Sequence, residues 1–311
     1  MECDGWPEIS FFKINSKAVL LAYLIIALSL LNYGCGVQEK DSAKKENAGN
    51  LMTLPSKSQK KIQKIMIAGS TSVQPIAEKL AEHYMALHPE AKIEVQGGGS
   101  SAGIQAAKTG AAEIGASSRE LKQDEKELCE FILAYDAIVL IVNPKNKISN
   151  LSLDQAMKIF SGQSSDWSAV DTSECGHITC ITREEGSGTR TAFEELIMRK
   201  KAEIADRCLV QDSTGALREI VADDPNAIGY VSFGGINDKV KPLSIDYVKP
   251  LMENFRQIDN SKKYKIIRPF LFVTRSKPEG LCLDFMNYIR SEEGIKILTR
   301  EGLIPADDQK K

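Results

Sequence analysis

Residues 64–84 read KIMIAGSTSVQPIAEKLAEHY, and the pattern of this stretch decides the fold class. A short apolar run at its start predicts a strand, which ends at the Ser/Thr/Gly loop 69–72. Pro75 suits the first turn of a helix, because that position needs no backbone N–H donor. Apolar and aromatic residues then recur at helical spacing: Ile76, Leu80, Tyr84 and Leu87. The stretch therefore predicts one strand–loop–helix unit.

The same order of elements recurs along the chain. Strands are expected at 92–96 and at 112–116, each ending at a Ser/Gly-rich loop. A second set follows, in which a strand at 177–182 leads to the loop 183–189 and a helix at 191–198. Repeated units of this kind predict an α/β fold with open, mostly parallel sheets.

The chain length indicates two compact units. At about 150 residues per domain, 311 residues correspond to two of them. The long apolar segment 131–142 could run from one unit to the other, and 266–274 is expected to be a return strand. Within the second unit, Ser152 and Gln155 have the spacing of a capping box, which predicts a helix that ends near Phe160.

Composition excludes some classes of protein. Hydrophobic residues make up 42% of the chain, enough for a sizeable core. The 40 Lys and Arg residues nearly balance the 42 Asp and Glu residues, which argues against a nucleic-acid partner. The three histidines and the cysteines show no H-x-x-x-H or C-x-x-C spacing, so no structural zinc site and no cofactor is expected. A metal enzyme with carboxylate ligands stays open on composition alone.

Residues 1–34 resemble a bacterial export signal. Lys13 and Lys17 precede the apolar run AVLLAYLIIALSLL at 18–31, which has 14 residues. A membrane-spanning helix needs about 20 residues, so this length suits the apolar part of a signal peptide.

The apolar run ends at LNYGC, residues 31–35, which resembles the lipobox of bacterial lipoproteins. We therefore expect Cys35 to be lipidated, to become the mature N-terminus and to anchor the protein to the membrane. Leu31 lies four residues before the cysteine rather than the usual three, so ordinary cleavage nearby or a retained short anchor stay open. Residues 35–63 are mostly polar and are expected to form a flexible tether.

Five cysteines remain if Cys3 is removed and Cys35 is lipidated: Cys129, Cys175, Cys180, Cys208 and Cys282. Export would permit disulfide bonds, and Cys175 and Cys180 are close enough in sequence to close a small loop. The odd number leaves at least one free thiol, and buried reduced cysteines are the alternative. The pairing itself is open at this point.

The loops rich in Ser, Thr and Gly suggest a site for an anion. They lie at 69–72, 97–101, 117–118 and 186–189, each just before a predicted helix. The carboxyl ends of strands in an open α/β sheet face one crevice, and helix N-termini offer unpaired N–H groups and a partial positive charge. Arg183 and Arg119 could add forked donors for a tetrahedral oxyanion.

The energetics require many donors. Taking a dianion out of water costs on the order of tens of kcal/mol in the idealised limit. Each hydrogen bond to a charged group returns about 1.5–3 kcal/mol, so such a site needs several donors from both units.

Each of these loops also has other interpretations. A single Ser or Thr at a helix start is usually an ordinary N-cap. Ala102 occupies the third glycine position of G-x-G-x-x-G, and no nucleoside-triphosphate loop of the type G-x-x-x-x-G-K-[ST] occurs. An exported hydrolase or phosphatase is disfavoured, because Ser187 lies in E-G-S-G-T rather than G-x-S-x-G and no histidine is near the loops in sequence.

Four segments resemble the ligand loops of periplasmic phosphate-binding proteins, the substrate-binding subunits of phosphate ABC transporters: GSTS at 69–72, QGGGSSAG at 96–103, GASSREL at 115–121 and REEGSGT at 183–189. Further segments support the resemblance, which covers nearly all of residues 64–305: YDAIV at 135–139, IFSG at 159–162 with Trp167, and IGYV at 228–231.

The resemblance implies a two-lobed, type II periplasmic-binding-protein fold. Each lobe would be a mostly parallel sheet flanked by helices, with hinge strands joining the two. Residues 64–136 and 266–311 would form lobe 1, and residues 137–265 would form lobe 2. The lobes would close on phosphate by a hinge motion.

The resemblance also implies which residues contact the oxyanion: Thr71, Ser100, Ser118, Arg183, Ser187, Gly188 and Thr189. Two neighbours, Ser72 and Ser101, could add a backbone N–H or a hydroxyl group.

One position departs from the family pattern. Where the best-studied members carry an aspartate that accepts the proton of hydrogenphosphate, this chain has Ser118. A serine cannot repel sulfate electrostatically, so selectivity between phosphate and sulfate is open. Glu185 or Asp136 could take over the role of acceptor, although Glu185 is expected to orient Arg183 instead.

The sequence and the resemblance together predict an exported, lipid-anchored phosphate-binding protein of the periplasm or cell surface. It would deliver phosphate to the permease subunits of an ABC transporter, act as a monomer and catalyse no reaction. Two alternatives keep the same fold. One is a binding protein for another tetrahedral oxyanion, sulfate or an organophosphate, and the other is a sensor or adhesin lipoprotein without a transport role.

Overall fold

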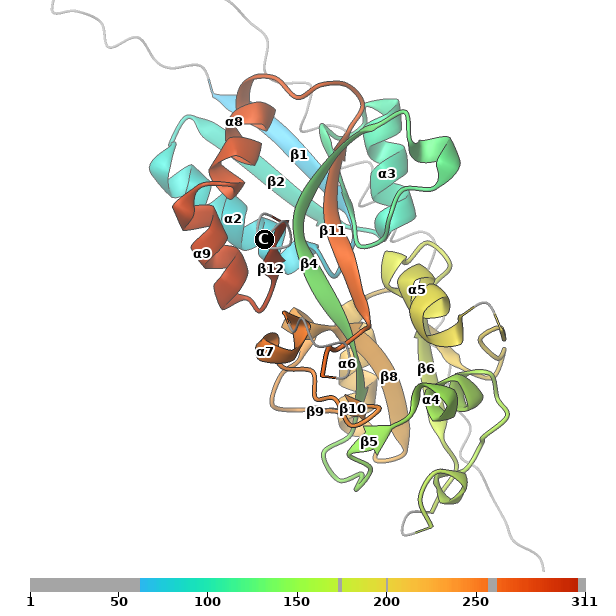
Figure 1. Ribbon diagram of the computed structural model, residues 1–311. Helices are drawn as coiled ribbons and strands as arrows, with labels where there is room; N and C mark the ends of the chain where they lie inside the picture. Colours follow the sequence, from blue (N-terminus) through green and yellow to red (C-terminus); the bar gives the residue numbers. More distant parts are fainter. Residues whose placement is uncertain (1–61, 173–174, 200, 257–261, 307–311) are drawn as a thin grey trace, which may run out of the picture. The chain divides into compact units, whose positions relative to one another are not determined.

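The computed structural model describes residues 62–172, 175–199, 201–256 and 262–306, shown as ribbons in Figure 1. These residues all belong to one compact unit, Gln59–Lys311. The predicted export signal, Cys35 and nearly all of the predicted tether lie outside the described residues. Within the described part of the chain, no helix has both the length and the apolar character to cross a membrane.

Eight strands form the main path of one sheet in the order β2-β1-β3-β11-β4-β8-β6-β7, with β12 and β9 pairing to β4. Their bounds are β1 (Gln63–Gly69), β2 (Ala91–Gly97), β3 (Ile114–Ser117), β4 (Cys129–Val142), β6 (Thr179–Arg183), β7 (Leu209–Gln211), β8 (Ala227–Ser232), β9 (Lys241–Pro242), β11 (Ile267–Thr274) and β12 (Ile304–Pro305). A separate pair consists of β5 (Asn150–Leu151) and β10 (Ser244–Ile245).

The parallel strands fall into two groups, and these define the two lobes. In the first lobe β1 pairs in parallel with β2 and β3, and in the second lobe β6 pairs in parallel with β7 and β8. The predicted α/β class and two-lobed architecture are therefore confirmed.

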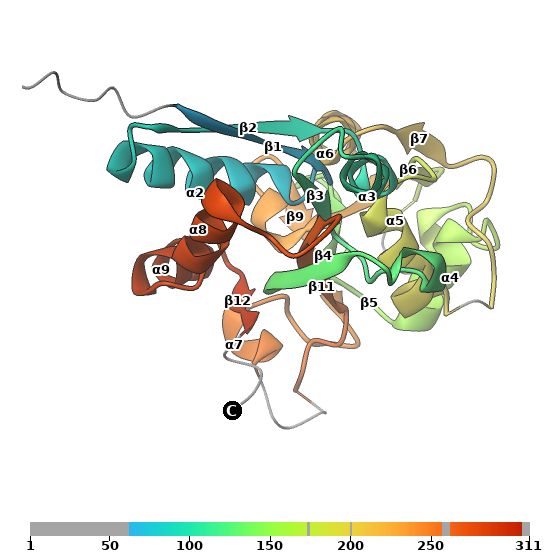
Figure 2. The same ribbon diagram turned by 90° about the horizontal axis from the view of Figure 1, so that it is seen from above.

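The long strand β4 connects the lobes. Its first part, Cys129–Ala137, pairs antiparallel with β11, and its second part, Ile138–Val142, pairs antiparallel with β8. The two long strands lie side by side where the lobes meet (Figures 1 and 2). The apolar segment 131–142 and the return strand 266–274 thus form the connections that the sequence predicted.

Helices cover both faces of the first lobe's sheet. They are α2 (Gln74–Leu87), α3 (Ser100–Thr109), α8 (Gly280–Ile289) and α9 (Glu292–Arg300). Side chains of β11 alternate between the faces, as in any strand. Phe270 and Phe272 pack with α2 and α8, whereas Leu271 and Val273 pack with α3. A strand buried on both faces has to be apolar at every position, as this part of β11 is.

The helices of the second lobe are α4 (Leu153–Phe160), α5 (Gly188–Phe193), α6 (Thr214–Asp223) and the short α7 (Met252–Phe255). The predicted capping box at the start of α4 is confirmed, because Ser152 accepts a hydrogen bond from the Gln155 N–H and the Gln155 side chain bonds back. The predicted helix 191–198 starts earlier, at Gly188, and its last turn, Glu194–Met198, is π-helical.

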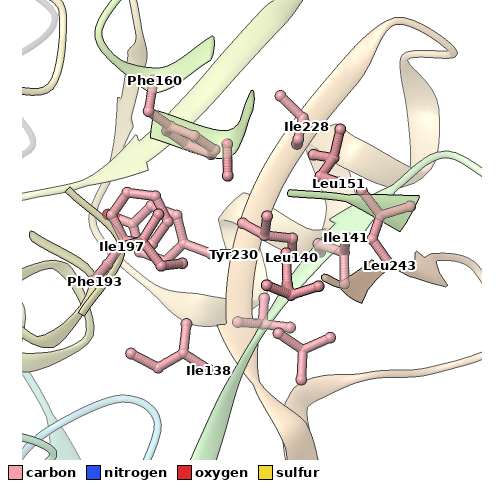
Figure 3. Packing of buried hydrophobic residues seen from close by; sticks show 14 of the residues in the cluster. Ile138, Leu140, Ile141, Leu151, Phe160, Phe193, Ile197, Ile228, Tyr230 and Leu243 are labelled. Carbon is pink, nitrogen blue, oxygen red and sulfur yellow. The ribbon is translucent and has the colours of Figure 1, made fainter. Parts of the chain in front are cut away.

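Aromatic rings fill the core between α4, α5 and β8 (Figure 3). Phe193 and Tyr230 stack with ring centroids 4.0 Å apart, and Phe160 lies 4.6 Å from Phe193. Since Tyr230 is on the strand beside β6, this packing fixes α5 against the end of β6.

A disulfide bond joins Cys180 on β6 to Cys208, just before β7. Cys175 is a free, exposed thiol, so the short loop between Cys175 and Cys180 that the sequence allowed does not form. Because β6 and β7 pair with each other, Cys180 lies next to Cys208, although the two are 28 residues apart in the sequence. Cys129 is also free, and burial raises the pKa of the free thiol of Cys282 to about 11.

Replacing the central ring of this core should cost much of the protein's stability. We expect Phe193→Ala to lower the free energy of unfolding by about 3–5 kcal/mol, because the site cannot collapse around the lost ring. Denaturant unfolding measures the change, with the exposed edge residue Leu209→Ala as a control expected to change it by less than about 0.5 kcal/mol. Equal losses in the two variants would contradict this packing.

Candidate functional site

The Ser/Thr/Gly loops of both lobes meet where the parallel strands end. The loop after β1 leads into α2, the loop after β2 into α3, and the loop after β6 into α5. Gly188, the first residue of α5, makes the close approach possible. A Cβ there would lie 2.3 Å from Ser100 Oγ and 2.8 Å from Ser118 Oγ, both in the first lobe. A side chain at position 188 would therefore collide with Ser100 and Ser118 unless these residues moved.

Arg183 is the charged group at the centre of this meeting point. It is the last residue of β6 and only 1% exposed. Its guanidinium donates to Thr71 Oγ1 of the first lobe at 3.1 Å and to Thr214 Oγ1 of the second lobe at 3.2 Å. Its Nε and Nη2 also donate to the Glu184 carboxylate, both at 2.9 Å. One buried side chain thus connects the two lobes.

The backbone of Arg183 is held by the aromatic core. The Tyr230 hydroxyl exchanges a hydrogen bond of 2.7 Å with Thr182 and accepts one from the Arg183 N–H at 3.3 Å. Burial raises the pKa of Tyr230 to about 12, so this hydroxyl remains protonated. The packing of the second lobe therefore fixes the place from which the guanidinium extends.

Three serines of the first lobe form a buried group of hydroxyls. Ser70 Oγ donates to Ser118 Oγ at 2.9 Å, and Ser118 Oγ lies 3.3 Å from Ser100 Oγ. Ser100 Oγ also accepts from the Ser118 N–H at 3.0 Å. Ser100 and Ser118 are fully buried, and their hydroxyl groups have only polar partners within this group.

Further hydroxyls connect across the lobes. Ser72 Oγ lies 2.8 Å from Thr189 Oγ1 and 3.1 Å from Thr214 Oγ1. Ser187 is the N-cap of α5, and its side chain accepts from the Arg190 N–H. We call these side chains, together with those of the first-lobe serines and Arg183, the hydroxyl cluster: Ser70, Thr71, Ser72, Ser100, Ser118, Arg183, Ser187, Thr189 and Thr214.

The structure brings most of the predicted contact residues into this cluster, with Gly188 beside it. Ser101 differs from the rest, because its N–H already donates to Gly186 O at 3.1 Å and its hydroxyl accepts from Arg119 at 3.4 Å. That any of these residues holds a ligand stays a prediction.

Arg119, the second guanidinium expected to serve an oxyanion, has another role. Its Nη1 and Nη2 donate to the two oxygens of Glu125 at 2.7 and 2.8 Å, and Nη1 also donates to Glu120 O. Both terminal nitrogens of Arg119 are thus occupied by a carboxylate, whereas Nη1 of Arg183 donates only to the Thr214 hydroxyl, which a bound anion could replace. The structure therefore gives Arg119 an ion pair with Glu125, and an oxyanion contact of Arg119 stays a prediction.

The expected partner of Arg183 was wrong. Glu184 takes this role, whereas Glu185 is exposed on the turn. Asp136, the other candidate acceptor, is buried in an ion pair with Arg268 at 3.1 Å. Burial raises the pKa of Asp136, and the charge of Arg268 opposes this rise.

Two members of the hydroxyl cluster were missed in the sequence. Ser70 lies in the loop 69–72, of which only Thr71 and Ser72 were expected to contact a ligand. Thr214 begins α6, after the N-cap Ser213 and the short strand β7. The sequence Ser213-Thr214-Gly215 has the same pattern as the other four loops, so it carried a usable signal.

Donors for an anion thus converge from both lobes: a guanidinium, hydroxyl groups, and the N-termini of α2, α3, α5 and α6. Helix N-termini carry a partial positive charge and unpaired N–H groups. Within the described ranges, no group of three or more His, Cys, Asp or Glu side chains could hold a metal ion. The chemistry that this arrangement supports is the dehydration and tight binding of a small anion.

Comparison with known proteins bears on this site. The model of the PBP superfamily domain matches residues 54–293. The phosphate-binding protein PstS of Bacillus subtilis is 33% identical over 304 residues, covering 96% of this chain and 97% of that protein. PstS of Borreliella burgdorferi is 28% identical over 301 residues, covering 93% of this chain and 98% of that protein.

Solved structures agree with these relatives. A putative phosphate ABC transporter substrate-binding protein from Clostridium perfringens, solved with bound phosphate, is 37% identical with a TM-score of 0.73 and covers 78% of this chain and 100% of that one. An ABC-type phosphate transport receptor from Vibrio cholerae is 33% identical with a TM-score of 0.63, at the same coverage of both chains.

The ion pair of Arg119 predicts how stability depends on pH. The Arg119 guanidinium holds the pKa of Glu125 below its ordinary value. A lowered pKa in the folded state stabilises the protein above the unfolded pKa of about 4.3, and this contribution is lost as pH falls through the folded pKa. We expect Glu125→Gln to be less stable than the wild type at neutral pH and to lose less stability on acidification below about pH 4.

The control for this measurement is Glu127→Gln. Glu127 pairs with Lys108 at 2.7 Å, and both side chains are exposed. Exposed pairs contribute little, so we expect a change below about 1 kcal/mol at neutral pH. Denaturant unfolding between acidic and neutral pH would contradict the account if Glu125→Gln followed the wild-type curve at every pH.

Proposed function

The chain belongs to the phosphate-binding proteins of the PBP superfamily, and we propose that its hydroxyl cluster is where it captures inorganic phosphate. It is a substrate-binding protein of phosphate transport, which holds phosphate between its lobes for an ABC transporter.

The observation that carries the proposal is the convergence of donors from both lobes at a buried point. Thr71 of the first lobe and Thr214 of the second share the Arg183 guanidinium. A phosphate oxygen that enters there would replace hydroxyl–hydroxyl contacts by hydrogen bonds to a charged group, which are stronger. Arg183, hydroxyl groups and helix N–H groups would together replace the hydration shell of the ion.

Capture would proceed by closure of the lobes around the ion. We propose the boundaries 64–136 with 266–311 for lobe 1 and 137–265 for lobe 2. They are supported by β4, which changes its pairing partner from β11 to β8 between Ala137 and Ile138. A hinge at this point would leave the lobes rigid, and the ion would complete a donor set that neither lobe holds alone.

We further propose that the protein is exported and works without catalysing a reaction. The sequence of residues 1–34 supports a signal peptide, and Cys35 supports a lipid anchor at the membrane followed by the tether 35–63. The disulfide bond between Cys180 and Cys208 fits an oxidising compartment. The protein would then act as a monomer, in the periplasm or at the cell surface, and would deliver phosphate to the permease.

Replacing Arg183 tests the site directly. Arg183→Ala should weaken phosphate binding by about 100-fold or more, since it removes several hydrogen bonds of about 1.5–3 kcal/mol each. Isothermal titration calorimetry on protein freed of bound phosphate measures the change, and Arg183→Lys should fall between the two because a lysine lacks the planar fork.

The control is Arg290→Ala, an exposed arginine that stacks over the Phe131 ring of the first lobe. It should bind phosphate as the wild type does. Unchanged phosphate affinity in Arg183→Ala, with a folded protein in thermal unfolding, would discard the site while leaving the family membership intact.

Sulfate is the second candidate ligand. Two carboxylates beside the cluster are paired with arginines, Glu184 with Arg183 and Asp136 with Arg268. A third residue, Glu301, lines the cavity next to Thr71, and its carboxylate pairs with Lys79. No carboxylate among the described cluster residues is thus free to reject a fully ionised tetrahedral anion. Competition between phosphate and sulfate decides between the two ligands.

A further inference from the structure

The direction of each hydroxyl in the site follows from its neighbours. A hydroxyl group has one hydrogen to donate and two lone pairs that accept. Where a protein N–H already donates to the oxygen, the hydroxyl's own hydrogen is left for another partner. Hydrogenphosphate needs both kinds of partner, because three of its oxygens accept and the fourth carries a proton.

Four hydroxyls of the cluster are arranged to donate. Thr71 Oγ1 accepts from Arg183 Nη2 at 3.1 Å and from the Thr214 N–H at 3.4 Å, and Thr214 Oγ1 accepts from Arg183 Nη1 at 3.2 Å. Ser100 accepts from a backbone N–H in the same way. Ser187 does so as the N-cap of α5. The hydrogens of these hydroxyls can therefore point at a bound anion.

Ser232, at the end of β8, is arranged in the opposite way. Its Oγ donates to Asp136 Oδ1 at 2.7 Å. Asp136 also accepts from the Phe233 N–H at 3.2 Å and from Arg268 Nε at 3.1 Å. Asp136 and Arg268 are both at most 2% exposed, and protonating the carboxylate would leave the guanidinium as an uncompensated buried charge. The ionised Asp136 therefore keeps the Ser232 hydrogen, and the lone pairs of Ser232 remain free to accept.

Ser232 lies beside the hydroxyl cluster. It lines a small cavity of about 40 Å³ together with Thr71, Ser72 and Thr214, which are three members of the cluster. The lining also includes the apolar residues Ile76 and Phe270, and Glu301, whose carboxylate pairs with Lys79. An acceptor at this position borders the same space that the donors of Thr71 and Thr214 border.

We propose that Ser232, held as an acceptor by Asp136, receives the proton of hydrogenphosphate and so distinguishes phosphate from sulfate. This inference rests on the proposed function. Sulfate has no proton at neutral pH, so its lone pairs would meet those of Ser232 and both would stay unpaired. Ser232 thus accepts the proton that an aspartate at position 118 would accept in the best-studied members of the family. Asp136 touches no ligand and is a positioning residue.

The experiment compares four tetrahedral anions near neutral pH. Phosphate and arsenate carry a proton, whereas sulfate and selenate do not, and each pair spans a similar range of size. Competition calorimetry on the wild-type protein should show tighter binding of both protonated anions. In Ser232→Ala, which leaves Asp136 paired with Arg268, the ratio of sulfate to phosphate dissociation constants should fall by about tenfold or more.

Two further variants make the test specific. Ser232→Thr keeps a hydroxyl and should restore the wild-type ratio. Ser161→Ala, which removes a half-buried hydroxyl of the second lobe that donates to Lys158 O, should leave the ratio unchanged. Asp136→Asn should lower the ratio as Ser232→Ala does, because the amide can donate to Ser232 and release its hydrogen; thermal unfolding shows whether this variant folds.

The outcomes separate the two proposals. If the wild type binds phosphate but Ser232→Ala weakens phosphate and sulfate equally, or leaves both unchanged, the role of Ser232 is overturned and the proposed function stands. If the wild type does not discriminate between protonated and unprotonated anions, the role of Ser232 is likewise overturned. If the wild type binds no tetrahedral anion, the proposed function itself fails.

Discussion

The buried charge of Arg183 is the constraint on which the rest of the site depends. A guanidinium that is 1% exposed has to find partners for its donors, because an unpaired buried charge costs several kcal/mol. Glu184 supplies the countercharge, and the Gln211 and Asp212 carbonyls accept from the same group at 3.3 and 3.2 Å. The remaining partners are hydroxyls on both lobes. An anion that enters between the lobes could take the place of these hydroxyls as a partner of the charge.

Apolar packing in the second lobe holds that charge in place. Tyr230 and Phe193 stack behind β6, and the disulfide bond from Cys180 fixes β6 near the start of β7. Gly188 allows α5 to reach the first lobe. The proposed hinge lies on β4, where its pairing partner changes from β11 to β8, and it would let each lobe stay rigid during closure. Binding and closure then become one event.

Local sequence patterns predicted the repeated units, the capping box of Ser152 and the Ser/Thr/Gly loops at the strand ends, because each depends on neighbours in the chain. Ion pairs and disulfide bonds that depend on the tertiary structure could not be predicted in this way. Glu125 lies six residues from Arg119 and still takes its guanidinium, and the pairing of Cys180 with Cys208 follows from the adjacency of β6 and β7. Thr214 was missed because β7 has three residues and its Leu209 and Val210 are exposed, so no buried strand marked the loop.

The central claim is that groups from both lobes, centred on Arg183, surround a dehydrated phosphate ion. A crystal structure of the protein with phosphate tests it most directly. The account predicts tetrahedral density within hydrogen-bond distance of the Arg183 guanidinium, with Thr71 and Ser118 contacting it from the first lobe and Thr189 from the second. Phosphate bound away from Arg183, or held by one lobe alone, would contradict the account.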